Sequence, residues 1–471
     1  MRMMSLLTLC MTSMATAGAN DVPWPEHPRP DFQRPTWVNL NGPWAFRFDP
    51  DDVGVEQEWF TPGKRTFDRE IIVPFGWESR LSGINDTEYR GVAWYAREIT
   101  IPDSDEWRGK EPWLVIGAAD FETTVWVDGQ EAIEHVGGYI PFAVNLAGFA
   151  KPGEKVSIII RVKDTTDEHQ PVGKQHGWYT RTSGIWQTVY LEPRGETHIG
   201  SIKFHPDIKK GTVRCGVRLD KRTAGGVMKV SSPDGAFDPV EWTWGEDVDV
   251  VIEDIEIKQP RLWSPDDPHL YNVRFELTAD GQSIDRVDSY FGLREISVGK
   301  PAADAVNLIR LNGKPIYLRG ALHQSFHPAG VYQYPDDATM RSDYELCKKL
   351  GLNFLRIHIK TPIPRELYWA DKLGVLIMQD MPNYWKHSEQ ATIWWQETME
   401  ASIARDSNHP SIFSWCLFNE TWGIGDGGYS TERQEWVRRM FQLAKQLDPT
   451  RLLADTSQGT RDHFVTEVKP C

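Results

Sequence analysis

The sequence predicts a multidomain β plus α/β protein, in which two β-sandwiches precede a partial (β/α)8 TIM barrel. The 471-residue length exceeds that of one ordinary domain. Short apolar runs separated by Gly, Pro and Asp dominate from residue 37 to residue 299. Strands and helices then alternate strictly, which is typical of a parallel α/β architecture.

The first β-rich part is predicted to be a jelly-roll sandwich over residues 20–195. No helical period interrupts its short apolar runs between Trp37 and Pro193. Asp128-Gly129 is typical of a tight β-hairpin turn. The runs 155–162 and 187–191 alternate or are β-branched, as in strands of the same sandwich.

A smaller, immunoglobulin-like sandwich is predicted over residues 196–298. We expect its strands at residues 213–219, 228–230, 248–257 and 271–279. About 100 residues of short strands is the usual size of such a domain. The segment 258–265 is expected to be a connection.

Residues 299–471 are expected to form part of a barrel. Strands are predicted at residues 316–322, 353–357, 376–378, 412–418 and 452–454, and helices at residues 338–350, 364–373, 393–405 and 431–447. Gly351 and Gly374 follow two of these helices and are typical helix stops.

Polar side chains follow successive strands of this part: His323, His358, Asp380 and Glu420. Parallel strands of a barrel bring their carboxyl ends to one face, where the active sites of such folds lie. The sequence therefore predicts a site at this face.

Asn419-Glu420 is the strongest candidate, because it ends the bulky apolar run 412–418. Such a strand can present a carboxylate only at its end. We expect Trp415, Phe418 and Trp422 to surround Glu420 and to raise its pKa, as a general acid requires.

Composition restricts the partners. The net charge of −15 argues against nucleic acid and against anionic membranes. The 21 Trp residues are compatible with carbohydrate binding, since flat rings stack on sugars. The cysteines Cys215, Cys347, Cys416 and Cys471 have no metal-ligand spacing, so we expect neither a metal site nor a disulfide framework.

The N-terminus is predicted to be a signal peptide over residues 1–19. Arg2 precedes an apolar stretch, and Ala15-Thr16-Ala17 fits a cleavage site. The stretch is too short to span a membrane. This predicts a periplasmic or secreted protein.

Taken together, these motifs resemble glycoside hydrolase family 2, the family of β-galactosidases, β-glucuronidases and β-mannosidases. Residues 37–44, 73–78, 94–97, 127–129 and 184–186 are similar to its sugar-binding jelly roll. Residues 291–295 and 311–316 resemble the start of its barrel. Asn408-His409-Pro410-Ser411 with Asn419-Glu420 resembles its acid/base signature.

The resemblance implies a retaining β-glycosidase that hydrolyses O-glycosidic bonds of β-galactoside- or β-glucuronide-type carbohydrates in carbohydrate catabolism. Glu420 would be the acid/base, and Asn419 would bind the sugar 2-hydroxyl. His323, His358 and Asp380 would bind other hydroxyls. Arg356 would orient carboxylates or be structural, and Trp385 and Trp422 would stack on sugar or pack the barrel rim. No cofactor is implied, and a homo-oligomer stays open.

Two departures from the family pattern matter. The motif after the second barrel strand is Arg356-Ile357-His358-Ile359-Lys360, which leaves the choice of sugar open. The stretch after Pro301 is also shorter than the roughly 250 residues of a complete barrel.

The nucleophile is therefore expected beyond Cys471, because Glu467 follows the fifth strand too early. Asp455 is the alternative second carboxylate. A chain without the nucleophile would bind sugar without turnover, so a carbohydrate-binding protein is the alternative function. An adhesion module built from the two β-domains would not need Glu420 at all.

Overall fold

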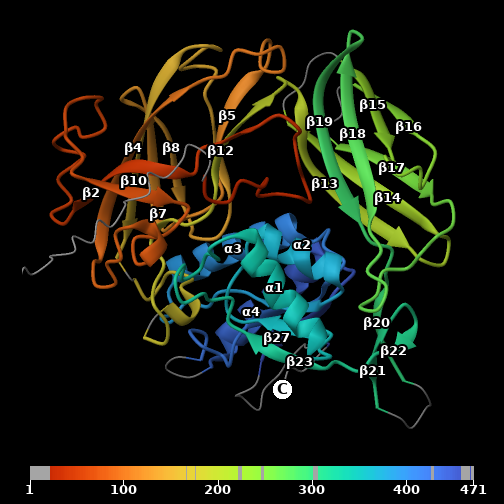
Figure 1. Ribbon diagram of the computed structural model, residues 1–471. Coiled ribbons are helices and arrows are strands. Elements are labelled where there is room, and N and C mark those ends of the chain that lie inside the picture. Colours follow the sequence, from red (N-terminus) through yellow and green to blue (C-terminus); the bar gives the residue numbers. More distant parts are fainter. Residues whose placement is uncertain are drawn as a thin grey trace, which may run out of the picture.

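Two β-sandwiches and a parallel α/β unit follow one another along the chain, and Figure 1 shows both sandwiches on one side of the α/β unit. The computed structural model describes residues 22–165, 167–175, 177–220, 225–245, 249–300, 306–425, 429–457 and 467. The predicted signal peptide lies outside these residues. The fold class expected from the sequence is confirmed.

The jelly-roll part consists of twelve strands and two short 3-10 turns. They are β1 (Val38–Asn39), β2 (Gly42–Asp49), β3 (Arg69–Val73), η1 (Arg80–Ser82), β4 (Gly91–Thr100), β5 (Glu111–Ile116), β6 (Ala119–Asp120), β7 (Glu122–Val127), β8 (Gln130–Val136), β9 (Phe142–Asn145), β10 (Lys155–Asp164), η2 (Gly173–Gln175), β11 (Gly184–Ile185) and β12 (Val189–Arg194). Two antiparallel sheets face each other, in the orders β1-β12-β5-β9 and β3-β2-β4-β10-β7-β8. Asp128 and Gly129 form the predicted hairpin turn with φ of 49° and 80°, as a two-residue turn requires.

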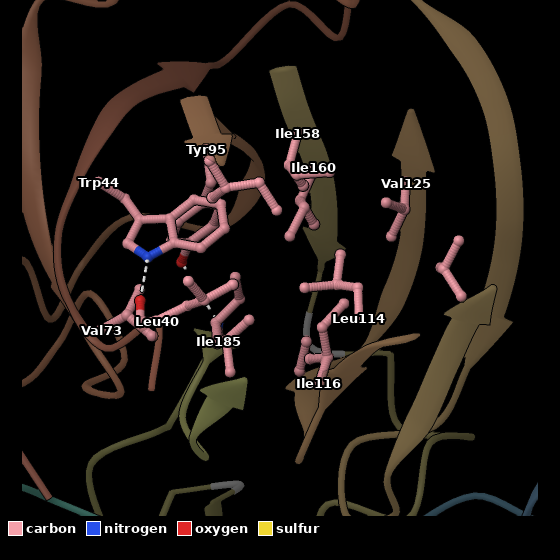
Figure 2. Packing of buried hydrophobic residues seen from close by; sticks show 14 of the residues in the cluster. Leu40, Trp44, Val73, Tyr95, Leu114, Ile116, Val125, Ile158, Ile160 and Ile185 are labelled. Atoms are coloured by element: carbon pink, nitrogen blue, oxygen red, sulfur yellow. Dashed lines mark hydrogen bonds between the residues drawn. The ribbon is translucent and has the colours of Figure 1, made fainter. Parts of the chain in front are cut away.

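Apolar side chains of the two sheets meet in the jelly-roll core, which Figure 2 shows. Ile160 of β10 lies in the same cluster as Leu114 and Ile116 of β5, and none of the three is exposed. Trp44 of β2 fills one side, where its indole N–H donates to the carbonyl of Leu40 at 2.9 Å. Burial of each such side chain contributes about 1.5–3 kcal/mol, so the sandwich has a substantial core of its own.

The second sandwich is immunoglobulin-like and has seven strands. They are β13 (His198–Asp207), β14 (Thr212–Asp220), β15 (Gly226–Ser231), β16 (Val240–Trp244), β17 (Asp249–Glu256), β18 (Tyr271–Ala279) and β19 (Gln282–Phe291). Its sheets run β13-β14-β17 and β16-β15-β18-β19, with Phe204, Val217 and Phe275 in the core between them.

The α/β unit is a five-stranded, fully parallel sheet. After a small sheet of β20 (Ile296–Gly299), β21 (Leu308–Leu311) and β22 (Lys314–Pro315) come β23 (Gly320–His323), α1 (Asp337–Lys349), β24 (Phe354–Ile357), α2 (Pro364–Leu373), β25 (Leu376–Asp380), α3 (Glu389–Asp406), β26 (Ile412–Phe418), α4 (Thr431–Leu447) and β27 (Leu452–Thr456). The strands lie in chain order, β23-β24-β25-β26-β27. This order is that of consecutive βα units of a barrel.

Local capping explains where the helices begin. Asp336 accepts a hydrogen bond from the N–H of Thr339, and Ser388 accepts one from the N–H of Ala391. The second cap starts α3 at Glu389, four residues before the predicted Ile393, because a serine N-cap satisfies the free N–H groups of the first turn.

One predicted strand is displaced. The strand expected at residues 316–322 is absent as such, since β22 ends at Pro315 and β23 begins at Gly320. In β23, every residue from Gly320 to His323 pairs in parallel with β24, and the carbonyl of His323 also accepts from the N–H of His358.

The segment before β1 joins the two sandwiches. Arg34 is buried, and its guanidinium donates to Asp285 of β19 and to Glu192 of β12 at 2.9 Å each. Gln33 forms an antiparallel bridge with Asp288. One buried arginine thus neutralises carboxylates from both sandwiches.

The segment Asn408–Ser411 attaches the second sandwich to the α/β unit. The side chain of Asn408 accepts from the N–H of Phe204 at 3.0 Å and donates to the carbonyl of Ile202 at 2.7 Å. His409 is buried and lies 2.6 Å from Asp371 of α2. This motif, which resembled part of an acid/base signature, serves here as an interdomain joint.

No helix among the described residues combines the length and the apolar character needed to cross a membrane. Cys215, Cys347 and Cys416 are free thiols, and Cys215 and Cys416 are buried.

Replacing Arg34 with alanine should strongly destabilise the protein. The change leaves Asp285 buried without its arginine, whereas Glu192 keeps Arg194 at 2.7 Å, and loss of one partner of a buried ion pair typically costs about 3–5 kcal/mol. Urea unfolding followed by tryptophan fluorescence measures the loss. Arg108→Ala is the control, because Arg108 forms exposed ion pairs and should leave the midpoint nearly unchanged. Equal effects of both variants would contradict this account of the joint.

Candidate active site

Glu420 lies at the carboxyl end of β26, as expected, and its side chain is exposed whereas every residue of β26 is buried. The chain turns sharply here, with φ of 52° at Glu420 and 61° at Thr421. The N–H of Trp422 closes the turn on the carbonyl of Asn419 at 2.9 Å. Such φ values are rare outside glycine and often mark functional positions.

Asn419 is held on three sides. Its Oδ1 accepts from Arg356 at 3.1 Å and from the hydroxyl of Ser457 at 2.9 Å. Its backbone N–H donates to Asn383 at 3.1 Å. The Nδ2 of Asn419 is buried and has no hydrogen-bond partner among the described residues. It is therefore oriented and available as a donor.

Asp380 is the charged centre beneath this residue. Arg356 binds it through two nitrogens at 2.8–3.1 Å, and the Nδ1 of His358 lies 2.9 Å away. Burial favours the neutral acid, but Arg356 and His358 outweigh burial and hold the pKa of Asp380 below its usual value. Burial lowers the pKa of His358, so a neutral imidazole donates from Nδ1 and leaves Nε2 as an acceptor.

His323 lies at the end of β23, but its described hydrogen bonds are to residues outside the group around Asp380. Its Nε2 is 3.0 Å from Glu366 of α2 and 3.2 Å from the hydroxyl of Tyr334. Burial would raise the pKa of Glu366, but the hydrogen bond from His323 and the nearby Lys360 hold it below its usual value. The structure thus brings Arg356, His358, Asp380 and Asn419 together, while His323 joins a neighbouring network.

The aromatic residues divide between two layers. Trp385 and Trp422 stack on each other with ring centroids 4.6 Å apart and are partly exposed. Trp415 and Phe418, in contrast, are fully buried: Trp415 donates to Asp448, and Phe418 stacks on Trp395 of α3. The expectation that these two rings surround Glu420 is wrong, because they face the helices.

A jelly-roll loop completes the site, and the sequence did not predict its role. The N–H of Gly173 donates to the carbonyl of Asn383 at 2.9 Å, and the indole N–H of Trp385 donates to the carbonyl of Gly173 at 2.7 Å. Burial lowers the pKa of the next residue, Lys174, whereas Glu420 acts on it in the opposite direction. The loop therefore places a cation, Lys174, directly after the residue that contacts Asn383 and Trp385.

Two of the missed residues had a signal in the sequence. Ser457 comes directly after β27, so the strand-end rule that selected His358, Asp380 and Glu420 also applies to it. Trp178, whose ring lies nearly parallel to that of Trp422 at a centroid distance of 6.3 Å, stands in a polar stretch with no apolar period, which is unusual for so large an apolar ring. Lys174 had no such signal.

A buried carboxyl cluster anchors the far end of this loop. The hydroxyl of Ser183 lies 2.6 Å from Glu78 and 2.7 Å from Asp164, and Arg181 lies 2.6 Å from Asp164. One hydroxyl has one hydrogen, so it can donate to only one of the two carboxyl groups. Burial raises the pKa of Glu78 to about 8, which makes Glu78 the protonated partner at neutral pH.

The two other residues considered as the second carboxylate are either buried or already hydrogen-bonded. Asp455 of β27 is fully buried, and one of its oxygens accepts from the N–H of Thr456 at 2.8 Å. Glu467 accepts from Lys445 and from the N–H of Leu453, each at 3.0 Å. Among the described ranges, no group of three or more His, Cys, Asp or Glu side chains could hold a metal ion.

Three models of one family match the chain in consecutive segments. The sugar-binding domain of glycosyl hydrolases family 2 matches residues 37–194, a further domain of that family matches 197–294, and its TIM barrel domain matches 305–469.

Known relatives agree with these matches. A β-glucuronidase from Bacteroides fragilis is 28% identical over 91% of this chain, and a β-galactosidase from Thermoanaerobacter pseudethanolicus is 25% identical over 86%. The chain spans 62% and 52% of their lengths. The structure of a β-glucuronidase from Ruminococcus gnavus in complex with D-glucaro-δ-lactam has the same fold, with a TM-score of 0.76 and 21% identity over 90% of this chain and 72% of that one.

Glu78→Gln should flatten the pH dependence of stability. A folded-state pKa of about 8, above the ordinary 4.5, means that folding loses stability as the pH rises through this window. The slope cannot exceed ~1.4 kcal/mol per pH unit. Urea unfolding at pH 5, 6.5 and 8 should show a smaller decline in the variant. The exposed Glu70→Gln should keep the wild-type slope, and a parallel decline in Glu78→Gln would refute the protonated carboxyl.

Proposed function

The chain belongs to glycoside hydrolase family 2, and on this basis we propose that it is a retaining β-glycosidase of carbohydrate catabolism. Its substrates would be β-glucuronide- or β-galactoside-type carbohydrates, as the names of its relatives suggest. The signal peptide predicted from the sequence would direct it to the periplasm or out of the cell.

One observation carries the proposal: an exposed carboxylate lies directly above a buried polar row. Glu420 is open to solvent, whereas Asn419, Asp380 and His358 beneath it are buried. A general acid must reach the glycosidic oxygen, while the groups that bind the sugar are best fixed in advance. Glu420 would protonate the leaving oxygen and then deprotonate the incoming water.

Asn419 is suited to bind the sugar next to the scissile bond. Since Arg356 and Ser457 occupy its Oδ1, its free Nδ2 points to a substrate oxygen as acceptor. A hydrogen bond to the 2-hydroxyl would strengthen toward the oxocarbenium-like transition state. His358 offers Nε2 to a further hydroxyl, and Trp385 with Trp422 offers an aromatic wall.

No nucleophile is assigned. A retaining pair needs its two carboxyl groups about 5–5.5 Å apart across the sugar. Asp380 is neutralised by Arg356, and Asp455 is fully buried in β27. Glu420 therefore carries the acid/base role alone among the described residues.

Lys174 favours a uronic acid as the sugar. Its ammonium group lies over the ring of Tyr179, 5.8 Å from the centroid, and among the described residues no carboxylate is within ion-pair distance of it. A substrate carboxylate would give this cation an ionic partner, and hydrogen bonds between charged groups are worth about 1.5–3 kcal/mol.

Glu420→Gln should abolish most hydrolysis of glycosides with poor leaving groups. General acid assistance is worth about 10²–10⁴-fold, and activated aryl glycosides need little of it. Hydrolysis of methyl and dinitrophenyl β-glucuronides by a chain that also carries the second catalytic carboxylate measures the difference. Glu432→Gln, an exposed carboxylate in the first turn of α4, is the control and should keep full activity.

Two outcomes count against the proposal. Equal losses on both substrate classes would exclude the acid role of Glu420. Sugar binding without any turnover would instead support the alternative drawn from the sequence, a carbohydrate-binding protein, together with the expectation that this chain lacks hydrolysis.

Lys174→Gln should weaken the binding of methyl β-glucuronide by roughly tenfold or more and leave methyl β-galactoside unaffected, because only the uronide carries a carboxylate. Calorimetric titration in the Glu420→Gln background gives the dissociation constants. Lys151→Gln, an exposed lysine of the same sandwich, should change neither. Equal weakening for both sugars would refute the preference for a uronic acid.

A further inference from the structure

The jelly-roll loop that carries Lys174 also presents two large aromatic rings to solvent. Trp178 is 65% exposed and Tyr179 is 37% exposed. Rings of this size are normally largely buried. Tyr179 is supported from below by Phe326, at a centroid distance of 4.7 Å. Trp178 therefore presents an exposed aromatic face beside the candidate site.

Trp178 continues the aromatic wall of the site outward. Its ring is nearly parallel to that of Trp422, at an interplanar angle of 11° and a centroid distance of 6.3 Å. Trp422 stacks in turn on Trp385. Since Trp422 is two residues from Glu420, the three indoles form a series that leads from the acid/base toward solvent.

A pocket of about 340 Å³ lies against Trp178. It is lined by Trp178 and Tyr179 together with the polar side chains of Thr87, Glu88, Arg90 and Thr180. This volume is at the lower end of the roughly 300–1,000 Å³ range of ligand sites. A flat ring beside hydroxyl, carboxylate and guanidinium groups is the combination that binds a pyranose, whose faces are apolar and whose edges carry hydroxyls.

The loop is fixed at both ends, so this surface is preformed. Gly173 is hydrogen-bonded to Asn383 and Trp385, and Ser183 is bound to Glu78 and Asp164. Arg90 is held by the carbonyls of Thr87 and Tyr89, each at 2.8 Å. Preorganisation of this kind lowers the entropic cost of binding.

We propose that Trp178 and this pocket form a subsite for a second sugar ring on the leaving-group side of the scissile bond. The inference rests on the proposed function, because it takes Glu420 as the residue that faces the leaving oxygen. Glu420 is two residues from Trp422, whose ring faces that of Trp178, so a leaving group protonated by Glu420 would reach the ring of Trp178. The preferred substrates are therefore oligosaccharides rather than simple glycosides.

Calorimetric titration of the full chain in the Glu420→Gln background tests the subsite. The probes are methyl β-glucuronide, a hyaluronan tetrasaccharide with β-glucuronate at its non-reducing end, methyl β-galactoside and β-1,4-galactotriose. At least one oligosaccharide should bind more tightly than its methyl glycoside. Trp178→Ala should reduce that advantage about tenfold, which corresponds to ~1.4 kcal/mol and to the scale of an aromatic contact.

Two further variants separate stacking from general damage. Trp178→Phe should restore most of the affinity for the oligosaccharide, because it keeps an aromatic face. Trp242→Ala removes another exposed tryptophan, on β16 of the second sandwich, and should have no effect.

The outcomes distinguish the two proposals. If methyl glycosides and oligosaccharides bind equally well, and Trp178→Ala changes neither, the subsite is refuted while the proposed function stands. If no sugar binds, both are refuted.

Discussion

The site depends on one buried carboxylate, Asp371, which lies at the contact of three parts of the chain. It accepts hydrogen bonds from His409 at 2.6 Å, from the hydroxyl of Tyr290 at 2.9 Å and from the N–H of Ser411 at 2.9 Å. Burial disfavours a charged imidazole, but Asp371 raises the pKa of His409 above its usual value. The resulting ion pair fixes α2, the second sandwich and the turn before β26 against one another. Since β26 ends at Phe418, directly before Asn419 and Glu420, the position of the candidate acid/base is set by a joint at the opposite end of its strand.

A second constraint is that the buried carboxylate near Glu420, Asp380, is already neutralised by a side chain of the protein in the absence of substrate. Arg356 neutralises Asp380 and also orients Asn419, so one guanidinium serves both the electrostatics and the geometry of the row. Burying an unpaired carboxylate here would be costly, and the bidentate pair removes that cost. Glu420 is left outside this balance, open to solvent. The arrangement thus separates the buried groups proposed to hold a sugar from the exposed carboxylate proposed to exchange a proton with it.

Much of the fold was predictable because its signals are local. The strand 412–418 and the helices 364–373 and 431–447 lie at their predicted limits, since an apolar run, a proline at a helix start and a glycine stop act over a few residues. The strand-end rule found Asp380 and Glu420 for the same reason. It could not foresee which way Trp415 and Phe418 point, because that depends on the helices that cover the sheet. Lys174 was missed because only tertiary structure brings the jelly-roll loop to the candidate site, whereas the position of Trp178 in a polar stretch was a signal that went unused.

Gly173 shows how closely the two domains meet. With φ of 57°, it lies where a Cβ atom would come within 2.3 Å of the carbonyl oxygen of Ile359. Any side chain here would push the loop off the barrel edge and carry Lys174 and Trp178 away from Glu420. The position of Trp178 beside the candidate site therefore depends on the absence of a side chain at residue 173. Substrate range could thus change through the loop of one domain, while the chemistry on the other domain stays untouched.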